Sequence, residues 1–171
     1  MNKFIKKLND YLDKVEESLE SPQFVNWDSE DNDIFGYFEV DNTKYRMELK
    51  IQIGNNWSYS FSYFDGSDWS YNISHKGVGG FKVLSTIKYG LYHLYDIKKP
   101  DSIIFSAIDN SDTRKRLYRT SCEEFCKEKG YLLSNRGSEK LQLFVMFNKN
   151  LCDSEKENVF LSVQKVIELS K

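Results

Sequence analysis

The clearest pattern along the chain is a regular alternation of apolar and polar residues between positions 34 and 73. A period of two puts successive side chains on opposite faces of a strand, so this region is predicted to form a sheet with one apolar and one polar face. Asp41-Asn42-Thr43 and Asp65-Gly66 interrupt the alternation with residues typical of tight turns. We therefore expect an antiparallel meander of four strands, over residues 34–40, 44–53, 57–63 and 69–73.

A period close to 3.6 residues marks the first twenty positions instead. It predicts an amphipathic helix from Asn2 to Glu20, which Ser21-Pro22 ends because the residue before a proline avoids the α region. We expect this helix to cover the apolar face of the meander. The acidic stretch from Asp28 to Asp33 is interpreted as a solvated connector.

After Ser74 the chain shows helix and strand signals in turn. A glycine-rich turn precedes a helical stripe, and the next continuous apolar run is typical of a buried parallel strand. The fold class is therefore α/β, of the α+β kind: a single domain over residues 1–171, with a mixed sheet and flanking N- and C-terminal helices. The predicted elements of this half are a helix over 81–95, a strand over 102–108, a helix over 113–129 that Gly130 ends, strands over 131–133 and 141–147, and a helix that begins at Ser154 and carries Val159, Phe160, Val163, Val166 and Ile167 on its apolar stripe.

The third predicted strand carries a row of aromatic residues, Trp57, Tyr59, Phe61 and Tyr63. Such rows stack the bases of single-stranded nucleic acid where basic side chains lie beside them. Here the intervening residues are serines, so core packing is the better interpretation. The net charge of −2 also argues against general binding of nucleic acid or anionic membranes. Because the first helix is charged throughout and no apolar run is long enough to span a bilayer, we expect a cytoplasmic protein, of a bacterium or a phage-infected host.

The three cysteines do not form a recognisable metal site. Cys122 and Cys126 lie one helical turn apart on an apolar face, which favours two small buried hydrophobic residues. His75 and His93 are far from them in sequence and have no ligand spacing of their own. No metal is predicted.

The turn formed by Gly77, Val78, Gly79 and Gly80 is the first candidate for a binding site. Glycines let a ligand approach the backbone, and the N–H groups at the start of a helix favour a phosphate. The turn is not a P-loop, because Phe81-Lys82-Val83 follows it in place of a Lys-Ser/Thr pair. A tight turn without a ligand would have the same sequence, so both interpretations stay open.

The order of meander, glycine turn, helix, parallel strand, helix and two strands resembles the GNAT superfamily of N-acetyltransferases. The resemblance implies that acetyl-CoA is the cofactor and that Gly77, Val78, Gly79 and Gly80 bind its pyrophosphate. It further implies that Asn110 is the asparagine after the parallel strand, and that Tyr118 is the acid that protonates the departing thiolate. The implied reaction transfers an acetyl group to the amine of an unidentified small molecule or protein.

Tyr118 also lies on the apolar stripe of its helix, so a core tyrosine is the alternative to a catalytic one. A general base for an amine acceptor is not specified by spacing: Glu39, Glu48, Asp65 and His75 are all candidates.

The stretches Val83–Thr86, Ile104–Ala107 and Leu117–Tyr118 resemble, more loosely, small proteins encoded by bacteriophages. That resemblance implies no activity. It supports a second hypothesis, in which the chain is a non-catalytic interaction or inhibitor protein on the same fold and binds a host protein. Nucleic acid and membranes are not expected partners.

Overall fold

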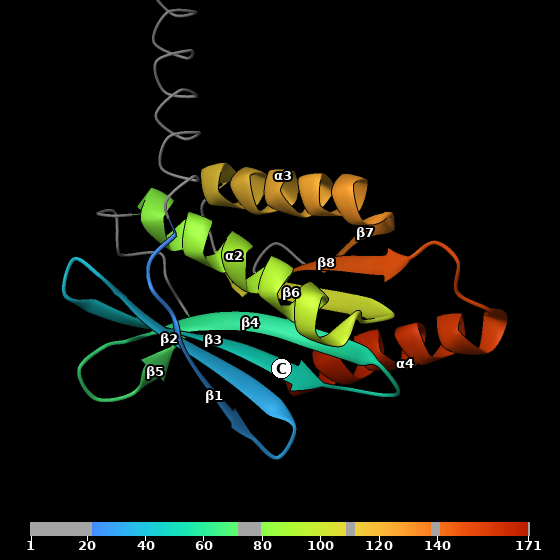
Figure 1. Cartoon of the computed structure of the whole chain (residues 1–171), viewed down its shortest axis with the longest axis horizontal. Coiled ribbons are helices and arrows are strands. Elements are labelled where there is room, and N and C mark those ends of the chain that lie inside the picture. Colours follow the sequence, from blue (N-terminus) through green and yellow to red (C-terminus); the bar gives the residue numbers. More distant parts are fainter. Residues whose placement is uncertain (1–21, 72–79, 109–111, 138–140, 171) are drawn as a thin grey trace, which may run out of the picture.

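The computed structural model describes residues 22–71, 80–108, 112–137 and 141–170. This part of the chain holds three helices and an open, mostly antiparallel sheet of eight strands (Figure 1). The predicted helix at residues 2–20 lies outside it. The strands are β1 (Asn26–Glu30), β2 (Asp33–Val40), β3 (Thr43–Ile51), β4 (Asn56–Phe64), β5 (Trp69–Ser70), β6 (Ser102–Ile108), β7 (Tyr131–Gly137) and β8 (Leu141–Asn148), and the helices are α2 (Gly80–Lys98), α3 (Asp112–Lys129) and α4 (Asp153–Leu169).

The strands follow the order β1-β2-β3-β4-β6-β8-β7, with the short β5 paired to β4. Among the described strands, only β4 and β6 pair in parallel, and α2 lies between their two halves of the sheet in the sequence. Helices α2 and α3 cover one face, whereas α4 packs on the opposite face against β4 and β6 (Figure 1). Both faces of the central strands are therefore buried, and each side has its own apolar core. The α/β class is confirmed.

The hairpin between β1 and β2 contradicts the interpretation of the acidic stretch as a connector. Asp31 and Asn32 form a two-residue turn with φ of 50° and 72°, a conformation that these two residue types tolerate. The acidic residues beside the turn lie on β1, which is an edge strand and leaves them in solvent. The predicted turn at Asp41-Asn42 is confirmed by the pairing of Val40 with Thr43.

Most of the later elements lie where the pattern predicted them. The strand at 102–108 matches β6, and Gly130 ends α3 with a φ of 73°. Three predicted bounds are wrong: β5 ends at Ser70 rather than continuing through Tyr71, β7 extends to Gly137 rather than to Leu133, and α4 begins at Asp153 rather than at Ser154. Residues 72 and 73 of the predicted strand lie outside the described residues. The N-cap of α4 is Cys152, whose N–H donates to Glu155 Oε2 at 2.7 Å.

The aromatic row of β4 is in the core, as predicted, because Trp57, Tyr59, Phe61 and Tyr63 are all buried. Cys122 and Cys126 are buried too, which confirms them as small core residues. Phe160 is a correction: it is 61% exposed, since α4 buries Val159, Ser162, Val163 and Val166 instead.

Helix α2 approaches the sheet most closely at Gly90. A Cβ atom at this position would lie 2.5 Å from Met47 Sδ and 2.6 Å from the Tyr59 hydroxyl. That hydroxyl is fixed, because it donates to the carbonyl of Ile87 at 2.6 Å. Glycine is therefore required for helix and sheet to pack at this distance.

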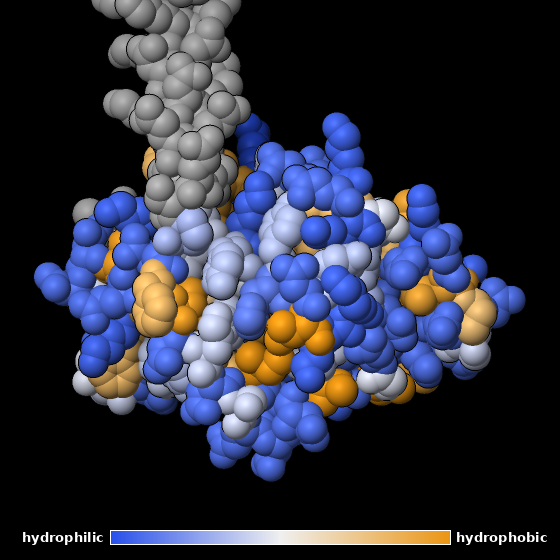
Figure 2. Space-filling view, in the orientation of Figure 1, coloured by the Kyte–Doolittle hydropathy of each residue, from blue (hydrophilic) through white to orange (hydrophobic). Residues whose placement is uncertain are grey.

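In the view of Figure 1 the surface is mostly hydrophilic, and its hydrophobic residues form small, separate patches (Figure 2). None of the helices in the described ranges is both long enough and apolar enough to cross a membrane.

Candidate functional site

The two parallel strands at the centre of the sheet separate part of the way along. β4 and β6 are paired over four positions, from Asn56–Ser102 to Tyr59–Phe105. Beyond them, β6 remains paired with β8 as far as Ile108, while the free edge of β4 pairs with β5 only at Tyr63 and Phe64. Residues 60–62 of β4 therefore lie along a gap in the sheet.

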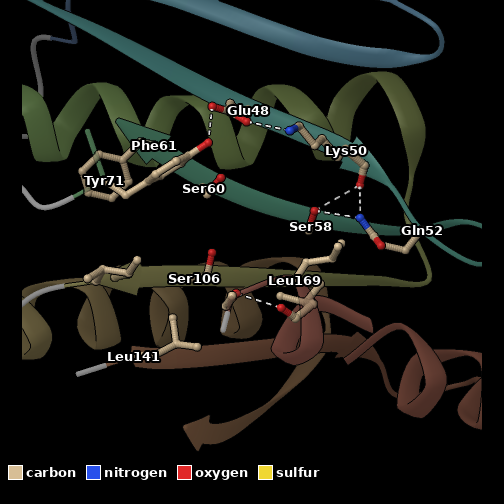
Figure 3. A pocket seen from close by; sticks show the side chains of 14 residues that line it. Glu48, Lys50, Gln52, Ser58, Ser60, Phe61, Tyr71, Ser106, Leu141 and Leu169 are labelled. Atoms are coloured by element: carbon tan, nitrogen blue, oxygen red, sulfur yellow. Dashed lines mark hydrogen bonds and ion pairs between the residues drawn. The ribbon is translucent and has the colours of Figure 1, made fainter. Parts of the chain in front are cut away.

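A hollow of about 360 Å³ lies at this gap (Figure 3). Ser60 and Phe61 line it from β4, and Ser106 and Ala107 line it from β6. Successive residues of a strand point to opposite faces of the sheet, so the hollow reaches between the strands rather than lying on one surface. Its other lining residues are Glu48, Lys50, Gln52, Ser58, Tyr71, Ile108, Leu141, Val166, Leu169 and Ser170.

The lining is polar on one side and apolar on the other. The polar side comes from β3 with Gln52 just after it, from Ser58 and Ser60 of β4, and from Tyr71 after β5. The apolar side comes from the end of β6, the start of β8 and the C-terminal turn of α4 (Figure 3). Helix α4 packs against β4 and β6 on the face of the sheet that the alternation marks as polar, so its C-terminal turn forms part of the wall of the hollow.

Glu48 is the most deeply buried charge of the hollow, with 2% of its surface exposed. Its Oε1 accepts hydrogen bonds from the Tyr71 hydroxyl at 2.7 Å and from Arg46, and its Oε2 lies 2.8 Å from Lys50 Nζ. Burial by itself raises the pKa of Glu48, but the hydrogen bonds from Lys50 and Tyr71 and the two neighbouring positive charges outweigh it. The pKa therefore lies below its ordinary value, and Glu48 is an ionised acceptor of hydrogen bonds at neutral pH.

Tyr71 and Arg46 are held by the same carboxylate. Burial and the hydrogen bond to Glu48 raise the pKa of Tyr71 to about 12, so its hydroxyl keeps its proton. The Arg46 guanidinium lies 4.6 Å from the centre of the Trp69 ring, which fixes it between β3 and β5. The polar side of the hollow is thus a pre-ordered network.

Of the residues predicted to bind a cofactor, only Gly80 is described: it is the first residue of α2. Gly77, Val78, Gly79 and Asn110 lie outside the described residues. A Cβ atom on Gly80 would meet nothing within 4 Å among the described residues, so its side-chain position is open.

Tyr118 is buried on α3, and its ring packs edge-on against Phe61 and Phe105, with ring centres 5.7 Å apart in both cases. Phe61 also lines the hollow. Tyr118 therefore lies behind the gap, one aromatic ring away from the hollow, and this position agrees with the core interpretation.

The four candidates for a general base are separated by the fold. Glu48 lines the hollow, Glu39 is exposed on β2, and Asp65 is fully exposed in the turn after β4. His75 lies outside the described residues. The lowered pKa of Glu48 makes it an anchor for hydrogen-bond donors rather than a group that takes up protons near neutral pH.

Sequence reasoning missed most of the hollow, including Lys50, Gln52, Ser60 and Tyr71. The alternation does place Glu48, Lys50, Ser58 and Ser60 on one face, and that shared face was the available signal.

Within the described ranges, no three His, Cys, Asp or Glu residues are grouped so that they could hold a metal ion. No protein-family model matches the chain, and a search of curated proteins finds no match.

Proposed function

We propose that this protein is a GNAT-like acyltransferase that moves an acetyl group from acetyl-CoA to an amine. The observation that carries the proposal is the separation of β4 and β6 after four paired positions, with a hollow in the gap. The strand order supports it, because an antiparallel meander is followed by a crossover helix, a parallel strand, a second helix and two antiparallel strands.

The gap offers a binding edge for the thioester. Backbone N–H and C=O groups alternate between the two edges of a strand, so at least one of each among residues 60–62 points away from β3 and into the gap. A backbone N–H of residues 60–62 would donate a hydrogen bond to the acyl carbonyl, and this bond would stabilise the charge that develops on its oxygen. Gly80 and the start of α2, where the helix dipole favours an anion, would hold the cofactor's pyrophosphate.

In the proposed reaction the amine nitrogen attacks the carbonyl carbon and the C–S bond breaks. Tyr118 would donate its hydroxyl proton to the thiolate and take up a proton from solvent afterwards, while the nitrogen releases one proton to solvent. Phe61 packs against Tyr118 and lines the hollow, so this role requires the Phe61 ring to move aside.

Calorimetry with acetyl-CoA tests the proposal, and Tyr118→Phe tests the assignment of the acid. We expect the wild type to bind acetyl-CoA, and Tyr118→Phe to bind it equally but to turn over more slowly, by about 10²–10⁴-fold for a lost proton transfer. Tyr92→Phe, on α2 with its hydroxyl bonded to Glu128, is the matched control and keeps full turnover. If acetyl-CoA at millimolar concentration does not bind, the proposed acyltransferase activity is rejected. If Tyr118→Phe turns over at an unchanged rate, the assignment of Tyr118 as the acid is rejected.

The second candidate function is non-catalytic binding of a host protein. It is favoured by two adjacent apolar side chains on α4 that lie in solvent, Phe160 and Leu161, which are 61% and 44% exposed. Under this alternative, acetyl-CoA does not bind and the gap between β4 and β6 has no cofactor.

A further inference from the structure

The charges beside the hollow do not cancel. Arg46 and Lys50 carry two positive charges and Glu48 carries one negative charge, and all three belong to one network. Among the described residues, Lys50 is the cation that lines the hollow, and 43% of its side chain is exposed. An ammonium group has three protons to donate, and the interaction with Glu48 uses one of them. Lys50 can therefore donate to a ligand without leaving Glu48.

A weaker negative feature faces the same hollow. The C-terminal end of α4 borders it through Leu169 and Ser170, and helix C-termini carry a partial negative charge. Ser170 reduces this effect, because its hydroxyl donates to the carbonyl of Val166 at 2.7 Å and its N–H to that of Ile167 at 3.2 Å. The full positive charge in excess around Glu48 is the larger of the two, so the polar side favours an anion.

The opposite side of the hollow favours an apolar group. Ile108 is 41% exposed and Leu169 is 75% exposed, and Leu141, at the start of β8, lies across the hollow from Glu48 (Figure 3). A hydrophobic group placed here would remove these side chains from water, which is favourable in proportion to the apolar area covered. The hollow thus combines a cation and an apolar wall.

We propose that the acceptor is an amine that also carries a carboxylate and an apolar side chain, the chemistry of a hydrophobic α-amino acid. Lys50 binds the carboxylate, the apolar side chain lies against Ile108, Leu141 and Leu169, and the amine lies toward the gap between Ser60 and Ser106. The role of the amine as acyl acceptor rests on the proposed acyl transfer. The binding of the carboxylate by Lys50 is independent of that reaction.

Titration of the full chain with leucine and with leucinamide, followed by NMR, tests this inference. The two probes share the amine and the side chain and differ only in the carboxylate. We expect leucine to bind at least tenfold more tightly than leucinamide, since an ionic hydrogen bond to a partly exposed ammonium is lost in the amide. Lys50→Gln should remove the difference, and Lys50→Arg, which keeps the charge, should retain it.

Lys44→Gln is the matched control, because Lys44 is an exposed lysine on the same strand and the same face but does not line the hollow. It should leave the preference for leucine unchanged. Equal binding of both probes, or tighter binding of leucinamide, overturns the inference, as does a preference that survives in Lys50→Gln. Failure here is distinct from failure of the proposed function: if acetyl-CoA binds but leucine is not preferred, only the acceptor class is wrong. If leucine is preferred but acetyl-CoA does not bind, the anion site stands and acyl transfer does not.

Discussion

Replacing Glu48 with glutamine removes the only negative charge of the network around the hollow and keeps the shape of the side chain. Three groups donate to this carboxylate: Arg46, Lys50 and Tyr71. Glutamine leaves one carbonyl oxygen for them, and its NH₂ group faces donors that it cannot accept from. Glu48→Gln should therefore destabilise the protein.

The size of the loss follows from these contacts. Hydrogen bonds to a charged group contribute about 1.5–3 kcal/mol each, and breaking a fully buried ion pair costs about 3–5 kcal/mol. Lys50 is 43% exposed and Arg46 20% exposed, so both regain water and part of the loss is recovered. We expect a decrease of about 2 kcal/mol in the free energy of unfolding. In urea this moves the midpoint of unfolding by about 1 M, for a slope of roughly 2 kcal/mol per M.

The pH dependence gives the same experiment a second readout. The pKa of Glu48 in the folded protein is below its ordinary value of 4.5, so the carboxylate contributes stability that is fully present above about pH 4.5. That contribution is lost as the pH falls through the pKa of Glu48 in the folded protein, because the protonated wild-type side chain is then uncharged, like glutamine. The difference in the free energy of unfolding between wild type and Glu48→Gln should shrink over the same pH range.

Urea unfolding at a series of pH values, followed by tryptophan fluorescence, measures both effects. Glu39→Gln is the matched control, since Glu39 lies on the neighbouring strand and is exposed; it should change the stability at neutral pH by less than about 0.5 kcal/mol. The reasoning is refuted if the two variants are equally stable at pH 7, or if the loss in Glu48→Gln is the same at acid pH as at neutral pH.

Two further predictions concern the packing of α2 and α3. Gly90→Ala should lower the free energy of unfolding by about 1–2 kcal/mol, because the overlap with the buried sulfur and hydroxyl below it exceeds the roughly 1 kcal/mol that alanine gains in a helix. Gly80→Ala, whose Cβ meets open space, should be neutral or slightly stabilising, and an equal loss in both would contradict the packing argument. A thiol reagent at pH 8 should modify only the exposed Cys152 in the folded protein. Burial raises the pKa of the Cys122 and Cys126 thiols, so both should react only after unfolding; rapid reaction of more than one thiol would show that α3 is not packed as described.

Strands and helices could be predicted because their signals are local. The alternation over β3 and β4 records which side chains are buried, and Gly130 is needed where α3 ends in the left-handed conformation. The acidic β1 was missed because an edge strand tolerates charges, so composition alone does not separate it from a loop.

The hollow could not be predicted in the same way, because it depends on two features of tertiary structure. The first is the position at which the pairing of β4 with β6 stops, which no residue in either strand specifies. The second is the packing of α4 against β4 and β6, which places its C-terminal turn across the hollow from Glu48 (Figure 3). The burial of Tyr118, in contrast, could be predicted from sequence, because Tyr118 lies on the apolar stripe of α3. It is in the core beside Phe61.

The central claim is that the gap between β4 and β6 binds the acyl end of a CoA thioester. An NMR titration of the full chain with acetyl-CoA tests it most directly, because each backbone amide reports separately. We predict saturable shifts of the amide signals of Ser60, Phe61 and Ala107, together with that of Gly80 at the start of α2. Acetyl-CoA at millimolar concentration that moves none of these signals, or moves only signals remote from the gap, would contradict the claim.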